Sequence, residues 1–195
     1  MTRRFKKVVD KTTALREKFW PDLSAEDLWS RKEFDGFTTI PRTMPLIMNI
    51  IDDLTKAKPA SSTYFALWCK AYDEMYVSLQ NAEELAFHAG FSGQRAVRTW
   101  QERMKDLADL GFIKVAAGPR GSMSHAAIPN PHFVIRRLHL AKQPGLTEAA
   151  YNTLLERGSD VSALDLTMEL PEDKAAREAA EAAALATVLA APKTP

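Results

Sequence analysis

The stretch that decides the fold is residues 81–128, NAEELAFHAGFSGQRAVRTWQERMKDLADLGFIKVAAGPRGSMSHAAI. Its first part predicts a short helix, because Asn81 can cap a helix N-terminus and Glu84, three residues later, can complete a capping box. Gly90 should end that helix, since glycine accepts the left-handed conformation that closes many helices. Phe91 then serves as an apolar plug. The sequence therefore predicts a helix followed by a tight turn.

A second helix is expected next, with Ser92 as its N-cap and Gly111 just after its last residue, about Leu110. Apolar residues recur along it at steps of three and four: Val97, Trp100, Met104, Leu107 and Ala108. This spacing places them on one stripe, which packs against a core. Arg95 and Arg98 therefore face away from that core, as do Thr99 and Glu102.

The outer face of this second helix is basic at its start and acidic at its end. Arg95 and Arg98 lie in the first two turns, where free N–H groups and the helix dipole also attract anions. Asp106 and Asp109 lie near the other end. This polarity suits a helix that enters a DNA groove with its N-terminus first.

A two-stranded hairpin is expected after the second helix. Residues 112–117 form the first strand, residues 118–121 the turn with Arg120 at its tip, and residues 123–128 the returning strand. Residues 76–79 are a further strand candidate beside the hairpin. The stretch thus ends in a small sheet with a basic tip.

Helix, turn, helix and basic-tipped hairpin together resemble the winged helix-turn-helix family of DNA-binding proteins. The resemblance covers about a quarter of the chain and rests on Glu84-Leu85-Ala86, Gly90-Phe91-Ser92, residues 95–100 and residues 107–113, LADLGFI. It implies sequence-specific binding to double-stranded DNA, commonly as a homodimer. The pattern is similar to regulatory and replication-initiator-like winged helices of plasmids and phages. Many initiators carry a second winged domain that this sequence does not show, so repression or plasmid maintenance fits equally well.

The predicted fold is mainly α with a small β-hairpin, a winged helix-turn-helix core with extra N- and C-terminal helices. Residues 1–42 form a basic arm and short helices, residues 43–142 the winged domain, and residues 143–195 a C-terminal helical extension with an alanine-rich tail. Helix starts are expected at Ser24, at Thr43 with Pro45, at Ser61 or Ser62, at Pro131, at Thr147 and at Pro171. The helix after Thr147 should end at Gly158.

Composition indicates a soluble globular protein, with 46% hydrophobic and 26% charged residues in 195. Cys69 is the only cysteine, which excludes an internal disulfide. No apolar run is long enough for a bilayer and no secretory signal is present, so we expect the bacterial cytoplasm or nucleoid. Neither a membrane nor a cofactor is expected as a partner.

The net charge of +1 conceals an uneven distribution along the chain. Residues 1–20 carry seven basic residues against two acidic ones, and residues 81–145 carry nine against five. Residues 146–195 carry four against nine. Positive charge therefore gathers on the stretch expected to read DNA and on the N-terminal arm.

Patterns typical of enzymes and metal sites are absent from the sequence. The four histidines do not pair with each other or with Cys69 at a metal-ligand spacing. Asp52-Asp53 and Glu83-Glu84 are neighbours on helices, where successive side chains diverge by about 100 degrees, so they are interpreted as caps or solvated charges. We expect no enzyme activity and no metal.

The expected DNA-binding residues are mostly basic: Gln94, Arg95, Arg98, Thr99 and Arg103 of the recognition helix, Arg120 of the wing, Arg136 and Arg137 after the hairpin, and Arg3, Arg4, Lys6 and Lys7 of the N-terminal arm. The arm has a second interpretation as a solvated tail. Two alternatives to DNA binding stay open. One is a protein-interaction module, with a partner held through the C-terminal extension, and the other is recognition of structured RNA by its shape.

Overall fold

The basic N-terminal segment folds as helix α1, Arg3–Phe19, followed by a short 3-10 turn, η1, Ala25–Asp27. The Ser24 hydroxyl accepts a hydrogen bond from the Glu26 N–H, which confirms the predicted cap. This computed structural model describes residues 3–119 and 121–190, and side chains for residues 11–119 and 121–185. The chain divides into two units between Phe37 and Thr38.

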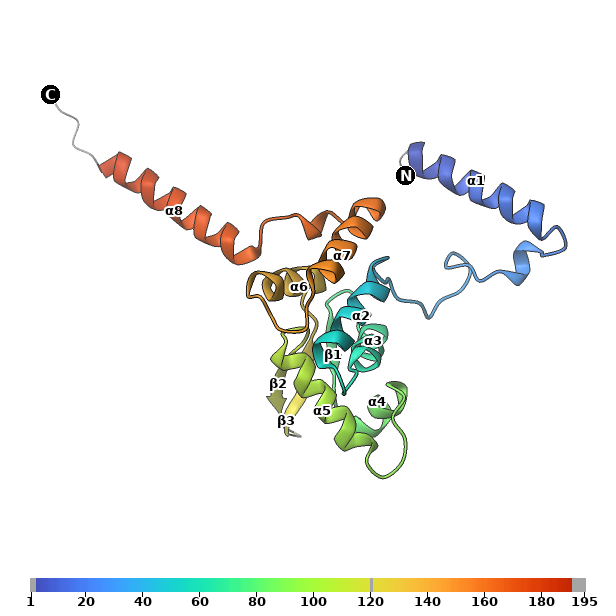
Figure 1. Ribbon diagram of the computed structural model, residues 1–195, viewed down its shortest axis with the longest axis horizontal. Helices are drawn as coiled ribbons and strands as arrows, with labels where there is room; N and C mark the ends of the chain where they lie inside the picture. Colours follow the sequence, from blue (N-terminus) through green and yellow to red (C-terminus); the bar gives the residue numbers. More distant parts are fainter. Residues whose placement is uncertain (1–2, 120, 191–195) are drawn as a thin grey trace. The chain divides into compact units, whose positions relative to one another are not determined.

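The second unit contains the predicted winged arrangement (Figure 1). Its elements follow in the order α2 Met44–Thr55, α3 Ser61–Lys70, β1 Tyr76–Ser78, α4 Ala82–His88, α5 Ala96–Asp109, β2 Lys114–Gly118 and β3 Gly121–Ala127. From α3 to β3, the order is therefore helix, strand, helix, helix and hairpin, which is the winged helix-turn-helix order. After them come α6 Pro131–Leu140, α7 Glu148–Val161, η2 Leu164–Leu166 and α8 Pro171–Ala190.

The small sheet is antiparallel, with β3 between β1 and β2. Tyr76 and Lys114 both align with Ala127, one on each side of it. The predicted strand beside the hairpin is thus confirmed. The first hairpin strand begins later than expected, because Phe112 and Ile113 are fully buried core residues that precede it.

The apolar stripe of α5 faces the core as predicted. Trp100, Met104 and Leu107 are buried, whereas Val97 and Ala108 are partly buried. The stripe ends in the LADLGFI segment, where Gly111 has φ +84° and the Phe112 N–H donates to the Leu107 carbonyl at 2.9 Å. This positive φ is what requires glycine, and it turns Phe112 back into the core. The sequence therefore fixes both the face and the end of α5.

Two predicted helix caps are replaced by contacts between distant residues. Neither Thr43 nor a serine makes a side-chain cap bond at the start of α2 or α3. At the start of α3, the Asp52 carboxylate acts as the cap. It accepts hydrogen bonds from the N–H groups of Ala60 and Ser61 at 3.0 and 2.9 Å and from the Ser61 hydroxyl at 2.7 Å. Of the two interpretations of Asp52, a cap or a solvated charge, the first is confirmed. The helix that Asp52 caps is the following one, α3, and not its own.

The chain beyond residue 143 continues to pack on the same core. Tyr151, Leu154 and Leu166 are buried with the residues of the winged part. Helix α7 does not end at Gly158 but continues to Val161. Gly158 lies inside the helix, where a Cβ would collide with the Leu166 side chain, so the glycine permits the close approach of η2. By contrast, every described side chain of α8 is exposed. None of the described helices combines the length and apolarity needed to cross a membrane.

Candidate nucleic-acid interface

The interface candidate begins with α4, which is held by its N-terminal cap. The Asn81 side chain accepts from the Glu84 N–H at 3.2 Å, as predicted. The reciprocal bond differs from a standard capping box, because the Glu84 carboxylate accepts from the Asn81 side-chain amide at 3.1 Å. Lys70 of α3 also binds Glu84, and this hydrogen bond lowers the pKa of the Glu84 carboxyl below its usual value. α3 and the start of α4 are thereby tied together.

The turn between α4 and α5 is longer than the sequence suggested. Gly90 has the expected positive φ, but Ser92 does not cap a helix. Gly93 is also left-handed, at φ +80°, and α5 begins only at Ala96 with Arg95 as its N-cap residue. The second left-handed glycine keeps the chain in the turn for three more residues. Gln94 and Arg95 therefore lie before the helix and not on it.

The end of the turn and the start of α5 present polar and basic side chains to solvent. The side chains of Gln94 and Arg95 are exposed, and among the described residues neither has a hydrogen bond or ion pair. The Arg98 side chain is 82% exposed, with its Nε 3.5 Å from Glu102 Oε1. An exposed pair of this kind contributes little, so Arg98 can still exchange Glu102 for a phosphate or a base. Thr99, which follows Arg98 on the helix, is half-buried.

Arg103 requires a correction, because the fold itself engages its guanidinium. Its side chain is 12% exposed, and Nε donates to the Pro59 carbonyl at 3.1 Å. Nη1 is buried without a hydrogen-bond partner. Arg103 thus ties α5 to the loop between α2 and α3 and does not face outward for DNA.

This tie brings Lys58 to the interface, a residue that is not among the predicted DNA contacts. Lys58 Nζ lies 3.7 Å from Glu102 Oε2, and the Lys58 side chain is 57% exposed. The local signal was Lys-Ala-Lys-Pro between two helices. The long-range bond from Arg103 to Pro59 holds this segment beside α5, and helical periodicity could not have predicted that contact.

The wing adds a stacked pair on the sheet. The Tyr76 hydroxyl and His125 Nδ1 are 2.7 Å apart, and the two rings stack with centroids 5.9 Å apart. Lys114 on β2 is exposed. Arg120 lies outside the described residues, as do the side chains of Arg3, Arg4, Lys6 and Lys7. Their predicted phosphate contacts stay predictions.

Arg136 and Arg137 contact the C-terminal segment, and their predicted phosphate contacts stay predictions. Arg137 donates from Nε and Nη2 to the two Glu172 oxygens at 2.6 and 2.7 Å. Arg136 donates to the Met168 carbonyl. Both guanidinium groups therefore attach the segment before α8, and the first turn of α8, to α6.

The Arg137–Glu172 attachment should be lost in acid. The hydrogen bond from Arg137 lowers the pKa of Glu172 from 4.5 to about 2. Because the folded pKa is depressed, the contribution of the pair is full above about 4.5 and disappears as the pH falls through about 2. An NMR pH titration of the Arg137 Nε–H and of residues 171–174 should show this step. A Glu172→Gln variant should lack the step, and an unchanged titration in that variant would contradict the assignment.

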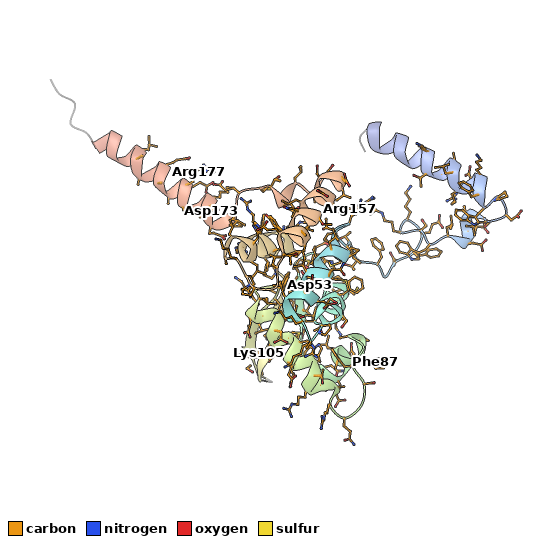
Figure 2. All side chains as sticks on the ribbon, viewed as in Figure 1. Asp53, Phe87, Lys105, Arg157, Asp173 and Arg177 are labelled. Carbon is orange, nitrogen blue, oxygen red and sulfur yellow. The ribbon has the colours of Figure 1, made fainter. Side chains whose placement is uncertain are left out.

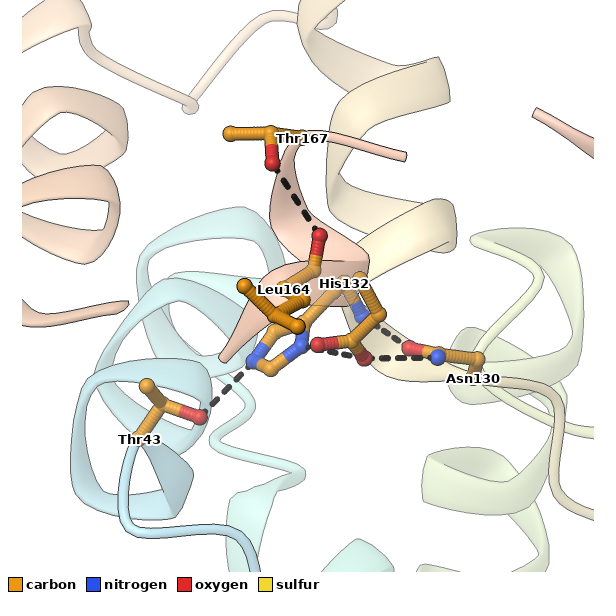
Figure 3. A network of polar contacts seen from close by, with 6 residues as sticks. Thr43, Asn130, His132, Leu164 and Thr167 are labelled. Atoms are coloured by element: carbon orange, nitrogen blue, oxygen red, sulfur yellow. Dashed lines mark hydrogen bonds and ion pairs between the residues drawn. The ribbon is translucent and has the colours of Figure 1, made fainter. Parts of the chain in front are cut away.

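A buried polar network joins three elements away from α5 (Figure 3). Thr43 Oγ1 lies 2.7 Å from His132 Nε2, and His132 Nδ1 lies 2.8 Å from Asp165 Oδ2. Asn130 donates to the same Asp165 oxygen at 2.7 Å and accepts from the His132 N–H at 2.9 Å. Burial raises the pKa of Asp165, but the hydrogen bonds from Asn130 and His132 outweigh it and hold that pKa below its usual value.

A hydroxyl, an imidazole and a carboxylate linked in this order also form the catalytic triad of hydrolases, but the surroundings of this network favour a structural role. Thr43 is 1% exposed. Three nearby N–H groups are used within the turn, because Met44 donates to the Pro41 carbonyl and both Leu46 and Ile47 donate to the Thr43 carbonyl. These three donors are therefore not available to an oxyanion. We interpret the network as a joint between the starts of α2 and α6 and the turn η2.

In the described part of the chain, no three histidine, cysteine or acidic side chains are grouped so that they could hold a metal ion. Comparison of the chain with protein-family models, with curated proteins and with solved structures gave no match.

Proposed function

We propose that this protein binds double-stranded DNA in a sequence-specific manner through the turn before α5 and the first turns of that helix. The observation that carries the proposal is the exposure of Arg95 and Arg98 at the start of a helix whose opposite face is anchored by Trp100. A recognition helix in a winged arrangement contacts base edges with its N-terminal residues. Arginine is the most common reader of guanine in the major groove.

The far half of α5 limits how deep such a contact can run. Glu102, Asp106 and Asp109 follow the two arginines, and Lys105, labelled in Figure 2, is paired with Asp109. Carboxylates repel phosphates, so the contact should be confined to Gln94, Arg95, Arg98 and Thr99. Lys58 and the wing would then hold the flanking backbone.

The role that fits a single winged unit is transcriptional regulation or a plasmid or phage replication or maintenance function, in the bacterial cytoplasm or nucleoid. Selection from a pool of random duplexes tests the proposal. We expect an enriched motif and binding that weakens steeply with salt, because phosphate contacts release counterions. A pool that stays random, together with salt-insensitive binding, would refute it. Competition by duplex RNA would instead support recognition of nucleic-acid shape.

A further inference from the structure

Two adjoining hollows lie along α2 and α3, and both have Met48 and Phe65 as walls. The first, of about 650 Å³, is also lined by Ile40, Pro41, Arg42, Met44, Pro45, Asn49 and Arg157. The second, of about 590 Å³, is also lined by Ser62, Ala66, Cys69, Lys70, His88, Ala89 and Gly90. Together they form an apolar groove, here called the α2–α3 groove.

The charge on the α2–α3 groove is entirely of one sign. No carboxylate lines either hollow. At one end, Arg42 and Arg157 are exposed, and within the described residues neither guanidinium has a partner (Arg157 is labelled in Figure 2). At the other end, Lys70 is already neutralised by Glu84. An occupant with apolar side chains and nearby carboxylates would therefore suit the end with the two arginines.

Helix α8 of this chain has that chemistry. Its described side chains are exposed throughout, including Leu185 at 61%. Glu178, Glu181 and Leu185 are spaced by three and four residues, so they lie on one side of the helix. Within the described residues, the ion-pair partners of these two glutamates are the neighbouring Lys174 and Arg177, at 3.8 and 2.9 Å on the exposed surface. Such pairs exchange at little cost.

We propose that α8 of a second copy docks in the α2–α3 groove, with Leu185 against Met48 and Phe65 and with Glu178 and Glu181 near Arg42 and Arg157. The exchange is reciprocal, so each copy gives one helix and receives one. Reciprocal contacts of this kind close a two-fold dimer and leave no free groove. Arg95 and Arg98 take no part in the contact, so the dimer does not depend on the proposed DNA binding.

A charge exchange between two variants of the full chain tests this arrangement. Arg42→Glu/Arg157→Glu makes the groove acidic, and Glu178→Arg/Glu181→Arg makes the helix basic. Each variant alone should associate at least about tenfold more weakly than the wild type, because like charges then meet. An equimolar mixture of the two variants should recover dimers. The acidic groove of the first variant can receive the basic helix of the second, and the unchanged basic groove of the second can receive the unchanged acidic helix of the first. Sedimentation equilibrium measures all four samples.

The matched control is Arg31→Glu/Lys32→Glu, which changes the net charge equally on exposed residues of the first unit and should leave association unchanged. Melting temperatures show whether every variant folds. Cys69, exposed and the only cysteine, provides a second readout in the wild-type chain. A photo-crosslinker attached there should link to residues 171–190 of the second copy, which isotope labelling of one copy identifies. A monomeric wild type, a mixture that stays monomeric, or crosslinks elsewhere would overturn the proposal.

Discussion

Replacing Arg95 and Arg98 together by alanine should weaken binding to the selected duplex by about 2–6 kcal/mol, because each well-formed arginine–base contact contributes about 1–3 kcal/mol of discrimination. The fold should not change, since both side chains are exposed and Arg98 has only a solvent-exposed partner. Fluorescence anisotropy at fixed salt measures the loss. The single Arg98→Ala variant should relax the preference at one base pair.

The control for this loss removes two positive charges elsewhere on the same unit. Lys105→Ala/Lys142→Ala changes exposed lysines, one of which is already paired with Asp109. It should reduce affinity only slightly and without changing the preferred sequence. If the two double variants bind equally well, then the start of α5 does not read DNA. Lys6→Ala should instead weaken binding to all DNA sequences alike. It should also reduce the slope of log K against log salt concentration by about 0.9, provided the arm contacts one phosphate.

The parts of this interface that the sequence predicted correctly depend on local patterns. The stripe around Trp100 and the left-handed Gly111 each involve residues a few positions apart, and each has a direct physical cause in helix geometry. The start of α5 was placed wrongly because Ser92 and Gly93 compete. A serine can cap a helix, but the glycine after it accepts a positive φ and keeps the turn open.

The arginines show a different kind of limit. Sequence spacing distinguishes the two faces of a helix, and it correctly assigned Arg98 to the outer one. It could not predict that Arg103 and Arg137 bind within the chain, because their partners, Pro59 and Glu172, are 44 and 35 residues away. A basic residue near a recognition helix is therefore available to DNA only if no distant carbonyl or carboxylate of the same chain already holds it.

The buried network around His132 illustrates the same point for stability, since Thr43 and Asp165 are 89 and 33 residues from it. His132→Ala should reduce the free energy of unfolding by at least about 1–3 kcal/mol, the cost of leaving one buried polar group unsatisfied. That group is the Thr43 hydroxyl, which would lose its only hydrogen-bond partner among the described residues, whereas Asp165 would lose one donor and keep Asn130. Urea denaturation measures this change.

The comparison variant is His88→Ala, whose side chain is 51% exposed and 4.0 Å from Glu84, and which should cost much less. The two substitutions also differ in where they act. Because Asp165 belongs to η2, hydrogen exchange in the His132 variant should rise first over residues 164–170, before the core around Trp100 opens. Arg95 and Arg98 lie on a different element, so a folded His132 variant should keep its DNA affinity. Equal exchange throughout the unit would show that the network stabilises the whole core, and a loss of DNA binding without unfolding would show that it reaches α5.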